Sequence, residues 1–257
     1  TYFFTYLLET VHKVKGGGRM FLTFKKWTAL YLLTLLLLFA GFAAILWQGS
    51  AVNASKNLSL EQGGGPVLLI DPGHGGMDGG AVSEDGTVES RINLAVGLQL
   101  EGIAQLIGMD TKMTRREDIS LHDSDIATVR QQKMSDLKNR TDFANSVPSG
   151  VLVSIHQNSL PSVRSVRGAQ VFYNAVPGSQ ELAEAVQSAL NEHMNERQKE
   201  AKQVGSEVYL MEHTEIPSIL VECGFLSNAQ DTALLNTQAY QTKHALTILS
   251  AARSNLW

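Results

Sequence analysis

The chain has 257 residues, of which 44% are apolar and 18% charged, and its net charge at pH 7 is −4. This length allows one large domain or two small ones, and the composition is ordinary for a globular protein. From residue 66 onward, about 15 Lys and Arg stand against about 23 Asp and Glu. Such a surface would repel a phosphate backbone, so nucleic acid is not expected as a partner. The single cysteine, Cys223, excludes an internal disulfide.

The first predicted element is a membrane segment. Residues 27–47 carry no charge and have a tryptophan at each end, and such a run is long enough to cross a bilayer at roughly 1.5 Å per residue. Basic side chains cluster before the segment, which predicts that residues 1–26 lie in the cytoplasm and that the rest is exported. We expect a retained signal anchor. A cleaved signal peptide is the alternative, because residues 52–54 resemble a cleavage site.

Two boundaries follow from local composition. Met20 stands directly before the basic residues that flank the apolar segment, so it is a candidate translation start, in which case the upstream residues are not translated. Residues 48–65 are rich in Ser, Asn, Gly and Gln, which predicts a flexible linker. The folded domain is then expected over residues 66–257, a length sufficient for one good core.

Within this domain, short apolar runs between Pro and Gly predict buried strands, and apolar residues at helical spacing predict helices. In chain order we expect a strand over 67–70, a helix over 89–107, a strand over 109–114, a surface excursion over 115–136, a helix over 137–145, strands over 151–155 and 168–173, a helix over 180–195, strands over 208–211 and 219–221, and helices over 232–235 and 239–249. The alternation predicts an α/β fold with a mixed, largely parallel twisted sheet and helices on both faces.

Three of the predicted strands end in a residue that can bind a metal ion or move a proton. These residues are His74, His156 and Glu222, and a further acid, Glu89, stands at the start of the first helix. Chemistry in an open α/β sheet sits beyond the carboxyl ends of the strands. Two imidazoles and two carboxylates match the inventory of a catalytic zinc site, with three ligands, an open position for water and one free carboxylate. Spacing alone does not prove it, since a histidine after a strand can simply face water.

Four motifs carry a more specific resemblance. They are Asp71-Pro72-Gly73-His74-Gly75-Gly76, Glu89-Ser90-Arg91-Ile92-Asn93-Leu94, Ser154-Ile155-His156-Gln157-Asn158 and Val221-Glu222-Cys223-Gly224-Phe225-Leu226-Ser227-Asn228. In this order they resemble the motifs of the zinc-dependent N-acetylmuramoyl-L-alanine amidases, and the resemblance covers residues 66–257. The short anchored layout is most similar to the germination-specific, spore cortex branch of the family. Ser90 departs from the pattern, since the family often has lysine there.

The resemblance implies a phosphorylase/hydrolase-like fold in which His74, Glu89 and His156 bind Zn²⁺ and Glu222 is the catalytic carboxylate. The substrate would be peptidoglycan, cut at the amide between the lactyl group of N-acetylmuramic acid and L-alanine. In the cortex branch, this step prepares muramic-δ-lactam for germination. The enzyme would work on the extracytoplasmic face of the membrane or in the cell wall, which for this branch is the forespore envelope.

Three further motif residues are candidates for orienting ligands or substrate by hydrogen bonds. They are Asp71, Asn93 and Asn158. Each has a plainer alternative: a strand-end cap for Asp71, a helix-surface amide for Asn93 and a turn-forming side chain for Asn158.

The sequence is also compatible with two other functions. A zinc carboxypeptidase-like peptidase could use a related fold and ligand set, although no arginine stands out as a clamp for a terminal carboxylate. A non-catalytic module that binds the cell wall is the second alternative, although all four active-site positions carry competent residues. The stretch between His156 and Gly168 is too short for the self-blocking helix of some division amidases, so regulation is expected from a separate activator protein or from timed expression.

Overall fold

The computed structural model describes residues 31, 34–36 and 65–256. The expected translation start, the membrane segment over 27–47 and the linker over 48–65 therefore lie almost entirely outside the described residues. The chain divides into residues 1–63 and residues 64–257. Within residues 31, 34–36 and 65–256, no helix is both long enough and apolar enough to cross a membrane.

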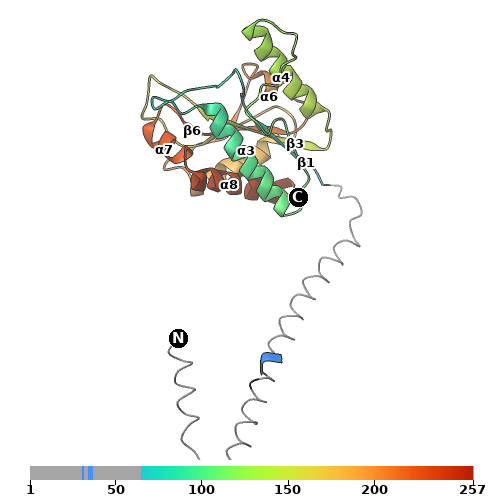
Figure 1. The fold of residues 1–257 in the computed structure, drawn as a ribbon, viewed down its shortest axis with the longest axis vertical. Helices are drawn as coiled ribbons and strands as arrows, with labels where there is room; N and C mark the ends of the chain where they lie inside the picture. Colours follow the sequence, from blue (N-terminus) through green and yellow to red (C-terminus); the bar gives the residue numbers. More distant parts are fainter. Residues whose placement is uncertain (1–30, 32–33, 37–64, 257) are drawn as a thin grey trace, which may run out of the picture. The chain divides into compact units, whose positions relative to one another are not determined.

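The second unit is built on one sheet of six strands in the order β2-β1-β3-β6-β4-β5, of which Figure 1 labels β1, β3 and β6. The strands are β1 (Val67–Pro72), β2 (Thr111–Met113), β3 (Gly150–Asn158), β4 (Gln170–Tyr173), β5 (Lys202–Gln203) and β6 (Ser218–Phe225). The first four in spatial order are parallel, whereas β4 runs antiparallel to β6 and β5 runs parallel to β4. This confirms the expected mixed, largely parallel sheet.

Helices cover both faces of the sheet, as expected. They are α3 (Glu89–Leu106), α4 (Val129–Asn145), α5 (Ser179–His193), α6 (Tyr209–His213), α7 (Ala229–Leu235) and α8 (Gln238–Leu256). Helices α3 and α5 both pack against α8, and α4 packs against α6. Figure 1 shows α3 and α8 on one side of the strands and α4 with α6 on the other.

Each face has its own core, because side chains alternate along a strand. On the α8 side, Ile70 and Val153 join the larger apolar cluster. Their sequence neighbours Leu69 and Leu152 point the other way, into a smaller cluster with Ala144 of α4 and Leu210 of α6. The central strands are thus apolar on both faces, which fixes the register of β1 and β3 and the relative positions of the residues that follow them.

The strand predicted over 208–211 is wrong, because this segment belongs to the short helix α6. Leu210 and Met211 are both buried although they are adjacent, which a half-exposed strand would not allow because its successive side chains face opposite sides. The helix ends at Thr214, because the backbone there is extended, with φ of −82° and ψ of 127°. Packing against α4 therefore outweighs the strand propensity of the Val-Tyr-Leu-Met sequence.

Helix α4 begins at Val129, eight residues before the expected start at 137, and so takes up part of the expected surface excursion. Thr128 caps it, because its Oγ1 accepts from the Gln131 N–H at 3.4 Å. The first turns carry few apolar side chains, which explains why hydrophobic spacing did not reveal them.

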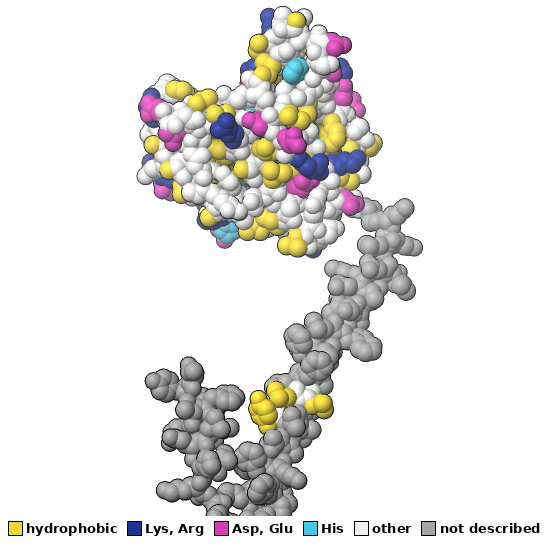
Figure 2. Space-filling view, in the orientation of Figure 1, with side chains coloured by type: hydrophobic (Ala, Val, Ile, Leu, Met, Phe, Trp, Pro, Cys, Tyr) yellow, Lys and Arg dark blue, Asp and Glu magenta, His cyan; other side chains and the backbone are white. Residues whose placement is uncertain are grey.

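Figure 2 shows acidic and basic side chains interspersed on the face that it draws.

One buried histidine of α8 is expected to lower the stability of the folded protein. His244 of α8 is fully buried, and neither ring nitrogen has a hydrogen-bond partner. Burial, with a smaller contribution from Lys243, lowers the pKa of His244 from 6.5 to about 3. Between these pH values the unfolded chain binds a proton that the folded chain does not, so this group makes the protein less stable as the pH falls from 6.5 toward 3.

We therefore expect His244→Leu to raise the free energy of unfolding by about 1–3 kcal/mol at pH 7, because it removes two buried polar atoms without partners. The gain should increase by about 2 kcal/mol at pH 5, where the unfolded parent is protonated. Urea unfolding at both pH values measures it. His193→Leu, at an exposed position of α5, is the control. A gain that does not grow in acid would contradict the prediction.

Candidate metal centre and active site

Three side chains from different elements converge at the carboxyl ends of the parallel strands. His74 lies in the loop after β1, Glu89 is the first residue of α3, and His156 lies near the end of β3. Their candidate ligand atoms all lie within 4.8 Å of one another. Glu89 Oε1 is 3.3 Å from His74 Nε2 and 3.0 Å from His156 Nδ1. The two imidazole rings meet edge to face, with centroids 5.0 Å apart.

The loop that presents His74 has an unusual backbone. His74 has a φ of 60°, in the left-handed region, and is the only described residue other than glycine with a positive φ. A conformation of this kind costs of the order of 1–3 kcal/mol and persists only where its surroundings impose it. Gly75 and Gly76 follow with φ of 133° and 58°, which glycine adopts without such a cost. The glycine-rich sequence therefore serves to turn His74 back over the end of β3.

Asp78 orients the His74 ring. Its Oδ2 lies 3.0 Å from His74 Nδ1, and its Oδ1 accepts from Lys133 Nζ at 2.9 Å. Although burial alone would lower it, the hydrogen bonds to Asp78 and Glu89 raise the pKa of His74 to about 9. With Nδ1 held by a carboxylate, Nε2 is left facing Glu89, which is the arrangement that carboxylates impose on histidine ligands. Asp78 is not among the residues predicted from the sequence, although its spacing of four residues from His74 is a visible signal.

Glu89 is held at both oxygens. Oε1 accepts from Asn93 Nδ2 at 3.3 Å and from the Gln157 N–H at 3.1 Å, and Oε2 accepts from the Ala81 N–H at 2.8 Å. Burial would raise the pKa of Glu89, but the hydrogen bonds from His156 and His74 hold it well below its usual range. The carboxylate is therefore charged and fixed in direction.

Asn93 links two of the candidate ligands. It is fully buried, and its Nδ2 also donates to the Gly73 carbonyl at 3.1 Å. Its Oδ1 accepts from Gln157 Nε2 at 3.2 Å. The side chain thus lies behind Glu89 and the His74 loop, and is not a helix-surface amide. Gln157 is buried and completes this contact. It was not predicted from the sequence as a site residue.

Glu222 lies beside the three converging side chains. It is the register partner of His156 on the neighbouring strand β6. Its Oε2 is buried and has no hydrogen-bond partner. Burial raises the pKa of Glu222 to about 7, with Glu89 adding to the rise and the two histidines opposing it. A carboxyl group with this pKa can accept and release a proton near neutral pH.

The two other predicted residues lie in different surroundings. Asp71 is fully buried and accepts from Thr114 Oγ1, Ser154 Oγ and Arg140 Nη1 at 2.7, 2.8 and 2.6 Å. It thus joins β1 to the middle of β3, to the residue after β2 and to α4, and among the described residues it makes no hydrogen bond to either imidazole. Asn158 accepts from the Ser159 N–H at 2.8 Å, which is the turn-forming alternative. None of the hydrogen bonds found among residues 65–256 joins its side chain to the ligand set.

Glycine is required where the backbone passes the converging side chains. A Cβ on Gly73 would lie 2.1 Å from His156 Nε2, and one on Gly80 would lie 2.5 Å from Glu89 Oε2. The loops therefore pack directly against the candidate ligand side chains. Two imidazoles and one carboxylate in this spacing fit a divalent transition metal, and a Glu and two His ligands are one of the donor sets of catalytic zinc sites.

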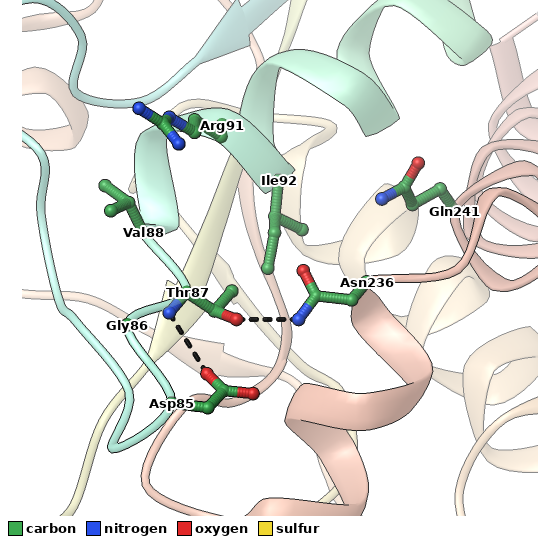
Figure 3. A pocket seen from close by; sticks show the side chains of 8 residues that line it. All are labelled: Asp85, Gly86, Thr87, Val88, Arg91, Ile92, Asn236 and Gln241. Atoms are coloured by element: carbon green, nitrogen blue, oxygen red, sulfur yellow. Dashed lines mark hydrogen bonds between the residues drawn. The ribbon is translucent and has the colours of Figure 1, made fainter.

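A polar pocket of about 300 Å³ lies beside the start of α3 (Figure 3). Its lining consists of Asp85, Gly86, Thr87, Val88, Arg91, Ile92, Asn236 and Gln241. Asn236 Nδ2 donates to Thr87 Oγ1 at 2.6 Å, and the Thr87 N–H donates to Asp85 Oδ1 at 3.0 Å. The first bond attaches the loop before Glu89 to the turn between α7 and α8, and the second braces that loop internally.

Known protein families and relatives match most of the folded unit. A model of the N-acetylmuramoyl-L-alanine amidase family matches residues 68–254. The chain is 30% identical over 223 residues to the germination-specific N-acetylmuramoyl-L-alanine amidase of Bacillus subtilis, covering 87% of this chain and 91% of that protein. The resemblance seen in the four sequence motifs is therefore confirmed.

Solved structures give the same result. The CwlD amidase from Clostridioides difficile, in complex with the GerS lipoprotein, aligns with a TM-score of 0.70 and 36% identity over 74% of this chain and 98% of that one. An N-acetylmuramoyl-L-alanine amidase from Clostridium difficile 630 aligns with a TM-score of 0.64 and 28% identity over 75% and 97%. The chain belongs to the N-acetylmuramoyl-L-alanine amidase family and is an enzyme with that activity on peptidoglycan.

Proposed function

We propose that this chain is a zinc-dependent amidase in which His74, Glu89 and His156 bind the metal ion and Glu222 is the catalytic acid and base. The bond cut is the amide between the lactyl group of N-acetylmuramic acid and L-alanine. The observation that carries the proposal is the convergence of the three ligand side chains within 4.8 Å beside a carboxyl group without a partner. The family match favours an amidase over a carboxypeptidase or a non-catalytic wall-binding module.

The residues divide the chemistry between them. A zinc ion held by this set supplies a Lewis acid that polarises the scissile carbonyl and lowers the pKa of water. Asp78 keeps the His74 ring in one orientation, and Asn93 does the same for the Glu89 carboxylate. Glu222 takes a proton from the attacking water and delivers it to the nitrogen of the leaving L-alanine, so that it acts first as a base and then as an acid.

We also propose a role in spore cortex maturation, where the product would lead to muramic-δ-lactam. Support comes from the similarity to the germination-specific amidase and to CwlD. Because the CwlD structure contains a lipoprotein, a lipoprotein is also the class of activator we propose here. The uncharged segment 27–47 supports a membrane anchor that places the enzyme on the extracytoplasmic face, in the forespore envelope.

The proposal is tested by digesting purified cortex peptidoglycan and identifying the fragments by mass spectrometry. We expect new muramyl lactyl groups and free L-alanine amino ends, with activity lost in the presence of a chelator and restored by Zn²⁺. His74→Ala should lose activity and metal together, because it removes one of three ligands. His193→Ala, at an exposed histidine of α5, should behave as the parent. Activity that survives both the chelator and His74→Ala would refute the metal mechanism.

A further inference from the structure

Two buried arginines lie directly behind the loop that carries His74 and the first turn of α3, which carries Glu89. Arg115 and Arg140 each have only 2% of their surface exposed. Neither takes part in the chemistry proposed above. Each guanidinium group donates to backbone carbonyls next to the candidate ligands, Arg115 donates in addition to the Glu117 carbonyl, and Arg140 also donates to two carboxylates.

Arg115 joins the backbones of two ligand segments. Its Nε donates to the Pro72 carbonyl at 2.8 Å, and its Nη2 donates to the Gly73 carbonyl at 3.0 Å. The same Nη2 donates to the Ser90 carbonyl at 2.8 Å. One side chain therefore connects the loop that carries His74 to the first turn of the helix that begins with Glu89.

Arg140 holds the same loop from the side of α4. Its Nη1 donates to the Pro72 carbonyl at 2.9 Å, and its Nη2 donates to the His74 carbonyl at 2.7 Å. Three successive carbonyls, those of Pro72, Gly73 and His74, are thus taken up by two guanidinium groups. This is the stretch in which His74 adopts its left-handed backbone conformation.

The charges of the two arginines are balanced locally. Asp71 accepts from Arg140 Nη1, and Asp136 accepts from Arg140 Nε, both at 2.6 Å. Two cations, Arg115 and Arg140, therefore lie beside two anions, Asp71 and Asp136. Burial and the neighbouring Arg140 lower the pKa of Arg115 to about 10, so both guanidinium groups are charged at neutral pH.

We propose that Arg115 and Arg140 are positioning residues that set the metal affinity by holding His74 and Glu89 at ligand distance before the metal binds. The inference rests on the proposed metal site. It adds the residues that hold the ligand side chains in place before the metal ion binds. A guanidinium is suited to this role because it offers five donors in a rigid plane, whereas a lysine offers one flexible ammonium group. Lysine can keep the charge but cannot reach two or three carbonyls at fixed angles.

The test measures metal binding by the folded protein and not turnover. Arg115→Lys, Arg140→Lys and the parent are stripped of metal, and each is titrated with Co²⁺ while the d–d absorption bands are recorded. Zn²⁺ affinity is obtained by competition with a chromophoric chelator. Arg116→Lys is the matched control, since Arg116 is the neighbour of Arg115 but has a side chain 55% exposed and paired with Glu101. Thermal unfolding of the metal-free proteins is measured in parallel.

We expect both variants to bind Zn²⁺ about 10- to 100-fold more weakly than the parent, as for other groups that orient metal ligands. Their Co²⁺ spectra should also change, because the ligands no longer meet at fixed angles. Arg116→Lys should remain within about twofold of the parent. A purely structural role would lower the unfolding temperature but leave the affinity and the spectrum of the folded protein unchanged, and that result would overturn the proposal.

Asp136→Asn provides a second variant in which both arginines remain. It weakens the contact that fixes Arg140, and we expect a smaller loss of Zn²⁺ affinity, about 3- to 10-fold. If the lysine variants do not fold, an unchanged affinity in Asp136→Asn overturns the proposal. A parent protein that binds neither Co²⁺ nor Zn²⁺ would instead refute the metal site itself, so the two failures are distinguishable.

Discussion

Glu222→Gln is expected to lower turnover of peptidoglycan by about 10²- to 10⁴-fold, the range that general acid and base catalysis contributes. Glutamine has the same shape but cannot take up and release the proton. Because Glu222 is not one of the three side chains grouped as ligands, the variant should bind Zn²⁺ as tightly as the parent. Loss of turnover with full metal content is thus the expected combination, in contrast to His74→Ala, which should lose both.

The experiment compares kcat on purified peptidoglycan with the zinc content of the same samples. Glu215→Gln, at an exposed glutamate before β6, is the matched control. The Glu222→Gln variant should also unfold at a temperature no lower than the parent, because Oε2 of the parent is buried without a partner and a neutral amide there avoids a buried charge. Turnover within tenfold of the parent would assign the proton transfer to another group.

The arrangement of the sheet could be predicted because it depends on local patterns that agree with one another. Apolar runs such as Val151–Ile155 give strands, and the helices between them require parallel crossover connections. Once β1, β3 and β6 are parallel neighbours, residues at or near their carboxyl ends must meet at one edge. This explains why His74, His156 and Glu222 could be expected together from the sequence, and the structure places them there.

Other features depend on contacts that no local pattern records. Helix α6 forms because Leu210 packs against α4 on the second face of the sheet, although its sequence favours a strand. Arg115 and Arg140 bind carbonyls 25 to 68 residues away in the chain, so no spacing in the sequence indicates their partners. The two-residue strand β5 contains only polar residues, Lys202 and Gln203, and therefore lacks the hydrophobic signal of a buried strand.

Asp71→Ala is expected to lower the free energy of unfolding by about 3–5 kcal/mol at pH 7, the cost of removing one partner from a buried ion pair. The Asp71 carboxylate is buried and accepts from a side chain of β3, from Thr114 beyond β2 and from Arg140. Its loss leaves two hydroxyl groups unpaired and leaves Arg140 with one acidic partner, Asp136. Urea unfolding measures the effect. Asp110→Ala, at an exposed aspartate before β2, should change stability by no more than about 0.5 kcal/mol.

The effect of Asp71→Ala should also depend on pH in a defined direction. Burial would raise the pKa of Asp71, but the charge of Arg140 and the hydrogen bonds from Thr114 and Ser154 hold it below its usual value of 3.8. A carboxyl group with a lowered folded pKa stabilises the protein above the unfolded pKa, and this contribution is lost as the pH falls through the folded value. The difference between parent and variant should therefore be largest above pH 5 and shrink below pH 4. Asp71→Asn, which keeps an acceptor oxygen but no charge, should lie between the two. If the difference in the free energy of unfolding did not depend on pH, packing and not the charge of Asp71 would account for its contribution to stability.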